Sequence, residues 1–232
     1  MNSTGAASSP PRAGSGAAAE RHPRKGESTR AAIIEQALSI ARREGLEGLT
    51  IGALAERLDM SKSGVFAHFG SREELQLAVL KQYTARFIDL VLRPAVARPR
   101  GLPRLAALLE NWLALLAEEI EAGCILIGGA CEYDDRPGPL HDALVAIIEG
   151  WKAELLRAIR MAQTEGHLDP GADAHQMVFE MYGLMLMLHQ DARLLRSSDG
   201  VQRARHGLAR LIEAARPRTL GAQAERARRR PH

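Results

Sequence analysis

Apolar residues recur at helical spacing along nearly the whole chain, and this pattern limits the possible folds more than any other feature. Between about residues 29 and 215 they return every three or four positions, which places them along one side of a helix. One such stripe is Ile33, Ile34, Ala37, Leu38, Ile40 and Ala41, and another is Leu105, Leu108, Leu109, Trp112, Leu115 and Leu116. Runs of β-branched residues are scarce, so the sequence predicts an all-α fold.

Capping residues and helix breakers divide this pattern into nine expected helices. Ser61 is the expected N-cap of the third helix, and Ser71 with Glu74 forms a capping box that opens the fourth, which should end before Pro94. The expected ranges are 29–45, 51–58, 62–69, 71–92, 102–122, 124–133, 140–165, 173–195 and 200–215. These helices fall into two domains, 28–75 and 76–216, flanked by a disordered arm (1–27) and a basic disordered tail (217–232).

The charge distribution is uneven. Residues 1–28 carry four Lys or Arg against two acids, and residues 216–232 carry six Arg against one Glu, within a net charge of +3. The body between them therefore holds more acids than bases, so net charge by itself does not argue for a nucleic-acid partner. The basic ends have two open interpretations, solubilising tails or contacts to DNA.

The two cysteines, Cys124 and Cys131, exclude a disulfide framework. Seven positions on an intact helix correspond to about 10.5 Å of rise, which is too far for a disulfide. The start of the chain lacks the apolar segment of a signal peptide, and no apolar run is long enough to cross a membrane. We therefore expect a reducing cytoplasm and no membrane partner.

Two short helices joined by a tight turn, the second capped by Ser61, are typical of a helix-turn-helix that binds DNA. Small residues on the second helix would let its backbone approach the duplex, and Lys62 can contact a phosphate or a guanine edge. Thr50 and Arg72 lie at helix N-termini, where backbone N–H groups favour phosphate. With the flanking positions, the expected DNA-binding residues are Arg30, Thr50, Ser61, Lys62, Ser63, Gly64, Phe66, Ala67, His68 and Arg72.

Residues 29–80 resemble the tetracycline-repressor (TetR) family of transcriptional regulators. The resemblance rests on Thr50-Ile51, Leu54-Ala55, the run from Met60 to Phe69, and Ser71-Arg72-Glu73-Glu74-Leu75. Three positions depart from the family pattern: Asp59 replaces a turn glycine, Phe66 a tyrosine and Arg72 a lysine. Aspartate tolerates the left-handed conformation better than most residues, so we expect the turn to form.

The resemblance implies a homodimer whose two DNA-binding domains recognise a pseudo-palindromic operator, most often as a repressor. It also implies a C-terminal domain that binds a small-molecule effector, which would move the fourth helix and release the DNA. From the residues we expect a largely apolar effector between the fourth helix and residues 102–165. The candidate pocket residues are Trp112, Cys131, Trp151 and His189. Helices 140–165 and 173–195 should form the dimer, with Met181 and Leu184 among the interface positions.

Other interpretations remain open. Cys124, Cys131, Glu132, Asp134, Asp135 and His141 could form a redox or metal sensor, although no ligand spacing is recognisable and a packed helix with an acidic turn is favoured. The methionines of helix 173–195 suit either a core or an adaptable pocket, and we favour the core. A sequence-tolerant DNA-binding protein is a further alternative. No nucleophile–base pair, phosphate loop or metal motif indicates an enzyme, and no cofactor is expected.

Overall fold

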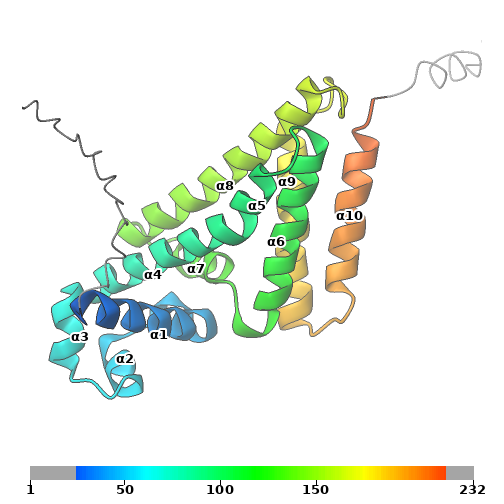
Figure 1. Ribbon diagram of the computed structural model, residues 1–232. Helices are drawn as coiled ribbons and strands as arrows, with labels where there is room; N and C mark the ends of the chain where they lie inside the picture. The colour runs from blue at the N-terminus through cyan, green and yellow to red at the C-terminus, as the bar shows by residue number, and fades with distance from the viewer. Residues whose placement is uncertain (1–24, 218–232) are drawn as a thin grey trace, which may run out of the picture.

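The computed structural model describes residues 25–217, and every regular element in that range is helical (Figure 1). The prediction of an all-α fold is confirmed. Residues 1–24 and 218–232, which hold most of the predicted arm and tail, lie outside the described residues. The α-helices are α1 (Lys25–Gly48), α2 (Ile51–Arg57), α3 (Lys62–Phe69), α4 (Arg72–Phe87), α5 (Arg93–Val96), α6 (Leu102–Ala122), α7 (Ile125–Tyr133), α8 (Pro139–Thr164), α9 (Ala174–His189) and α10 (Gly200–Ala214).

Helices α1, α2 and α3 form a small domain at one end of the molecule (Figure 1), which we call the head. Side-chain caps set its helix starts: the Thr50 hydroxyl accepts from the amide of Ala53 at 3.1 Å, and that of Ser61 from Gly64 at 3.0 Å. Asp59 in the turn between α2 and α3 has φ 51°, so an aspartate does hold the left-handed position. The prediction of residues 62–69 as a capped helix is confirmed residue by residue.

The regular part of α1 ends at Gly45, as the sequence predicts. Its φ of 82° favours glycine, and a Cβ there would collide with the Glu132 carboxylate of α7. That carboxylate accepts the amide of Glu47 at 2.8 Å. The end of α1 is therefore bound to the larger domain by an acidic residue of α7.

Helix α4 leaves the head and continues past the expected end at Leu92. Residues Ile88–Leu92 form a π-helical turn, η1, and α5 follows as Arg93–Val96 with Pro94 inside its first turn. The prediction that Pro94 would end the helix is wrong. Proline has no backbone N–H and therefore breaks the interior of an α-helix. In the first turn of a helix, however, the N–H groups have no intrahelical acceptor, so a proline there removes no hydrogen bond. The wider π turn restarts the helix there.

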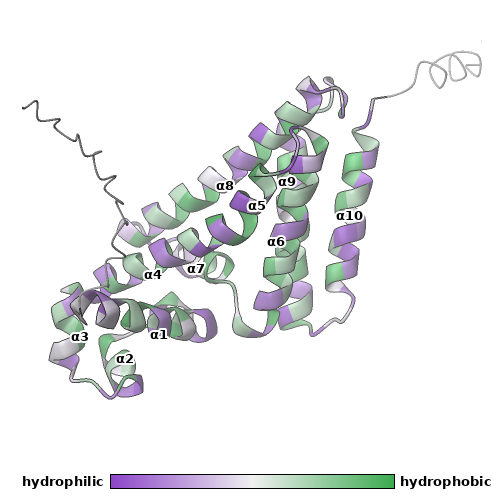
Figure 2. Cartoon of the chain, in the orientation of Figure 1, coloured by the Kyte–Doolittle hydropathy of each residue, from purple (hydrophilic) through white to green (hydrophobic). Residues whose placement is uncertain are grey.

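The larger domain packs α8 along α4, with α6, α9 and α10 beside them, and α7 packs against α1 and α8 (Figure 1). The long helices alternate hydrophobic and hydrophilic residues along their length (Figure 2), as amphipathic helices around a shared core do. Met177, Met181 and Met185 of α9 are buried, which supports the core interpretation of the methionines. Among residues 25–217, no helix is long and apolar enough to cross a membrane.

Candidate functional site

One face of α3 is exposed and carries most of the predicted DNA-binding residues. Val65 and Phe69 are buried in the head and fix the orientation of the helix. The opposite face presents Ser61, Lys62, Ser63, Phe66 and Ala67, with Gly64 and His68 half-buried between them. Phe66 is 52% exposed, which is unusual because phenylalanine side chains are mostly buried. The structure therefore brings this part of the predicted set together on one surface.

Lys62 lies at the N-terminal end of that face. A Cβ added at Gly52 would lie 3.4 Å from the Lys62 side chain, so the lysine stem extends over the start of α2. No ion pair involves this ammonium group within the described part of the chain. A cation without an acidic partner, beside the amides of a helix start, suits a phosphate.

The candidate DNA-binding residues outside α3 differ in how far their side chains are already bound within the protein. The Arg30 guanidinium stacks on the Phe69 ring at 4.8 Å and is exposed, and Thr50 uses its hydroxyl as a cap. Arg72, in contrast, donates to the carbonyl oxygens of Leu49 and Glu47 and pairs with the Glu47 carboxylate. Its guanidinium binds the connection between α1 and α2 while 40% of the side chain is exposed, so its contact with phosphate stays a prediction.

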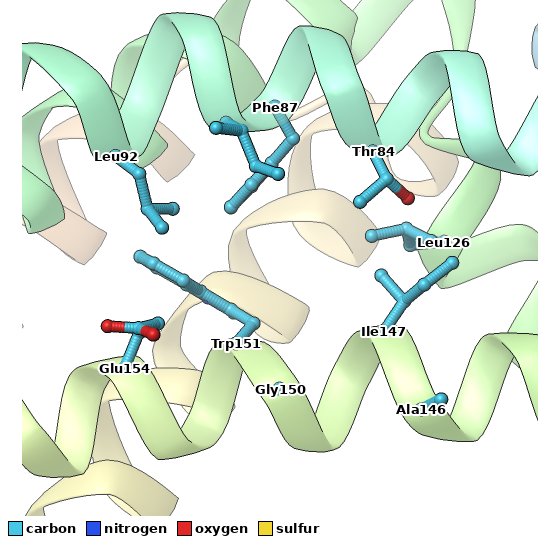
Figure 3. Close-up of a pocket in the computed structure, with 10 residues that line it drawn as sticks. Thr84, Phe87, Leu92, Leu126, Ala146, Ile147, Gly150, Trp151 and Glu154 are labelled. Carbon is cyan, nitrogen blue, oxygen red and sulfur yellow. The ribbon is translucent and has the colours of Figure 1, made fainter.

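A cavity of about 370 Å³ lies between α4 and α8 (Figure 3). Trp151 extends from α8 toward α4, close to Phe87 and Leu92, and Leu126 of α7 closes the opposite end. The polar lining residues are Thr84 and Glu154, and Glu154 pairs with Arg157 at 2.8 Å. Among the described residues, no Lys, Arg or His lines the cavity, so it suits a largely apolar molecule without negative charge.

Phe87 and Trp151 line this cavity, and further aromatic residues pack behind them. The Trp151 ring meets the Phe87 ring edge to face at 4.9 Å and the Trp112 ring at 5.1 Å. Tyr182 of α9 packs on Trp112 at 5.4 Å. A much smaller cavity lies behind Trp151, lined also by Tyr83 and Cys124 among others. The structure thus brings Trp112 and Trp151 together, as candidate pocket residues, with Trp151 between two cavities.

The other two pocket candidates lie elsewhere. Cys131 has an exposed thiol on α7 and lines neither of these cavities. His189, at the end of α9, lines neither cavity, and burial lowers its pKa. The pocket prediction is not supported for these two residues, since neither lines the cavity between α4 and α8.

The geometry also bears on the redox and metal alternative. Cys124 is buried and burial raises its pKa to about 12, so its thiol stays protonated and unreactive. Cys131 is exposed on the same short helix. No group of three metal-ligating side chains occurs among residues 25–217. The structure gives the sensor alternative no support.

The sequence interpretation missed several lining residues. Thr84 and Phe87 of α4 and Leu92 of η1 belong to the cavity, as do Leu126 of α7 and Ile147 of α8. The spacing of three to five residues between Thr84, Phe87 and Leu92 is the only signal in the sequence, and it is the same spacing that core residues show. They become a site only when α8 packs along α4.

An exposed apolar strip, the third feature of interest, runs along α9 and the turn that follows it. Its members are Phe179 (71% exposed), Leu186 (41%), Met187 (49%), Leu194 (70%) and Leu195 (61%). Surface exposure of this size over one helix is typical of a protein interface. Met181, in contrast, is fully buried in its own chain, and Leu184 packs against Gly207 of α10. The prediction of Met181 as an interface position is therefore wrong, whereas Leu184 is half-buried and stays a prediction.

The sequence matches the patterns of two protein-domain families. Residues 33–79 match bacterial regulatory proteins of the tetR family, and residues 101–208 match the tetracyclin repressor-like C-terminal domain. The first match covers most of the head and the start of α4. The second spans α6 to most of α10, so the two together cover both domains.

Individual proteins agree with these matches. The transcriptional regulator TcmR of Streptomyces glaucescens is 30% identical over 149 residues, which are 62% of this chain and 59% of TcmR. The match thus spans less than two thirds of TcmR. A TetR transcriptional regulator from Chloroflexus aurantiacus has a TM-score of 0.71 at 23% identity, covering 82% of this chain and 96% of that one. AibR, solved with isovaleryl coenzyme A and operator DNA, has a TM-score of 0.62 at 22% identity, covering 79% and 97%.

Proposed function

The chain belongs to the TetR family of helix-turn-helix, DNA-binding transcriptional regulators, and we propose that it is a ligand-responsive repressor. As a homodimer it binds a pseudo-palindromic operator and is released by a small, largely apolar effector in the α4–α8 cavity. The observation that carries this proposal is the exposed face of α3, where small residues surround the unpaired Lys62. Its double-stranded DNA partner follows from the family, and its relatives are regulators rather than enzymes.

The DNA contacts follow from the geometry of the head. The N-terminal end of α3 enters the major groove, so that Ser61, Lys62 and Ser63 reach phosphates or base edges. Phe66, Ala67 and His68 lie further along α3 against the flanking backbone, and Arg30 and Thr50 add contacts from α1 and α2. Arg72 contributes indirectly, since it holds the α1–α2 connection in place.

Selection from random duplexes tests this function. We expect the purified chain to enrich an inverted repeat, because two α3 helices related by a two-fold axis read two half-sites about one helical turn apart. The selected duplex should be bound at least about 10³-fold more tightly than random DNA at physiological salt. Equal binding of both duplexes would instead indicate the alternative, a sequence-tolerant DNA-binding protein, and no binding to either would refute the proposed function.

The effector site follows from the position of α4. This helix forms one wall of the cavity and also packs against α1 and α3 of the head. A molecule that separates α4 from α8 therefore tilts the head. Such a movement changes the spacing of the two heads in a dimer and lowers the affinity for the operator.

The cavity lining predicts which molecules stabilise the protein. We expect neutral indole and cationic tryptamine to raise Tm and anionic indole-3-acetate to have the weakest effect, because Glu154 faces the cavity and no base does. A ligand at about 100 times its Kd adds about 2.7 kcal/mol, or roughly 5–10 °C in Tm for a chain of this size. Differential scanning fluorimetry measures the shift.

A cavity-filling variant provides the control. Ala146→Phe places a ring at the cavity wall and should abolish stabilisation by indole, whereas Ala114→Phe on the exposed side of α6 should not. Stabilisation by sugars or phosphates alone would contradict an apolar pocket.

A further inference from the structure

Glu119 of α6 is the one fully buried carboxylate among the described residues, with 0% of its surface exposed. It lies where four helices meet. The Tyr83 hydroxyl of α4 donates to its Oε2 at 2.8 Å, and the Arg42 guanidinium of α1 pairs with its Oε1 at 3.4 Å. Cys124, at the start of α7, lies 3.4 Å from the same hydroxyl. We call Arg42, Glu119, Tyr83 and Cys124 the junction cluster.

The junction cluster joins the head to the larger domain through backbone as well as side chains. Arg42 also donates its Nε to the carbonyl oxygen of Gly123, between α6 and α7. Gly123 has φ 95°, and a Cβ there would collide with the Arg42 carbonyl oxygen. Glycine is therefore required for the α6–α7 connection to approach α1 so closely. The approach fixes α1 against the end of α6.

The opposite side of the junction cluster faces the cavities. Tyr83 and Cys124 line the small cavity behind Trp151, and Trp112 and Trp151 line it too. The larger cavity shares Phe87, Leu126 and Trp151 with it. A molecule that displaces Trp151 therefore presses on Tyr83, whose hydroxyl is bonded to Glu119.

We propose that Tyr83, Glu119 and Arg42 form a relay that transmits occupancy of the cavity to the orientation of α1 in the DNA-binding head. This inference rests on the proposed function. When the cavity wall moves Tyr83, Glu119 loses the hydrogen bond at its Oε2, and the ion pair between its Oε1 and Arg42 rearranges. The head then turns about the end of α1.

The buried ion pair of the junction cluster favours a switch between two distinct side-chain arrangements over a gradual change. A buried ion pair is costly to form and costly to break on one side, so it holds a single geometry until a partner moves. Burial raises the pKa of Glu119, while the Tyr83 hydroxyl and the guanidinium of Arg42 oppose that rise.

The two tryptophans of the chain allow the relay to be tested without an effector. Trp112 and Trp151 both lie at the cavities, so their emission reports on the cavity when the selected operator duplex binds the head. In the full-length wild-type protein we expect an emission change on operator binding. Tyr83→Phe keeps the ring in the core but removes the donor, and should reduce that change by at least about two-fold. Glu119→Gln, which keeps the shape but removes the charge, should reduce it as well.

Tyr182→Phe is the matched control. It removes a hydroxyl from the same small cavity and leaves Glu119 and Arg42 untouched, so its emission change should equal that of the wild type. Circular dichroism melting confirms that each variant is folded. An undiminished response in folded Tyr83→Phe, or no wild-type response despite tight operator binding, would overturn the relay. A wild-type chain that selects no duplex would overturn the proposed function and the relay with it.

Discussion

Replacing Gly64 with leucine should abolish specific operator binding while the head remains folded. Gly64 is half-buried on the exposed side of α3, within its first turn, where a bulky side chain would hold the helix away from the groove. A Cβ there would lie 3.1 Å from the Ser61 hydroxyl, so the N-cap must shift by a few tenths of an ångström. Losing such a cap costs about 1 kcal/mol. Replacing a helical glycine regains about as much.

A gel-shift titration beside circular dichroism melting separates loss of binding from loss of fold. Ala114→Leu adds a leucine to an exposed position of α6 outside the head, and it should leave both measurements unchanged. Lys62→Ala should weaken binding and lower the salt slope by about 0.9 if the lysine contacts one phosphate. If it reads a guanine, the loss should be about 1–3 kcal/mol at one base pair. Normal operator binding by Gly64→Leu would show that another face of α3 meets the DNA.

The head was predictable from the sequence because local interactions determine it. Hydroxyl caps at Thr50, Ser61 and Ser71 each bond an amide three residues further on, so the helix starts are visible in the sequence. The left-handed turn at Asp59 follows from the same local logic.

Long-range packing accounts for what could not be predicted. Arg72 has the charge and position of a phosphate contact, but carbonyl oxygens 23 and 25 residues away bind its guanidinium. Met181 and Phe179 belong to one apolar helix, and only the packing of α9 on its neighbours decides that Met181 is buried and Phe179 exposed. The lining of the cavity likewise comes from α4, α7 and α8, whose apolar residues look alike in the sequence.

The exposed strip on α9 leads to the second large expected effect. Phe179→Glu combined with Leu186→Glu should convert a dimer into a folded monomer, because Phe179 is 71% and Leu186 41% exposed, so the two substitutions remove little packing from their own chain. Two linked heads bind an inverted repeat more tightly than one by about 10²–10⁴-fold, so operator affinity should fall by that factor. Sedimentation velocity measures the association state, and a gel-shift titration measures the affinity.

Two substitutions on the same chain make the result specific to this strip. Val96→Glu changes a side chain of similar exposure (57%) on α5 and should leave both the association state and operator affinity unchanged. Met181→Glu, two residues from Phe179 but fully buried, should instead unfold the larger domain, since an unpaired charge would enter its core. A wild-type chain that sediments as a monomer at micromolar concentration would contradict the dimer. If the α9 double variant stayed dimeric, the interface would lie on another face, because two carboxylates per chain buried against each other could not remain charged at neutral pH.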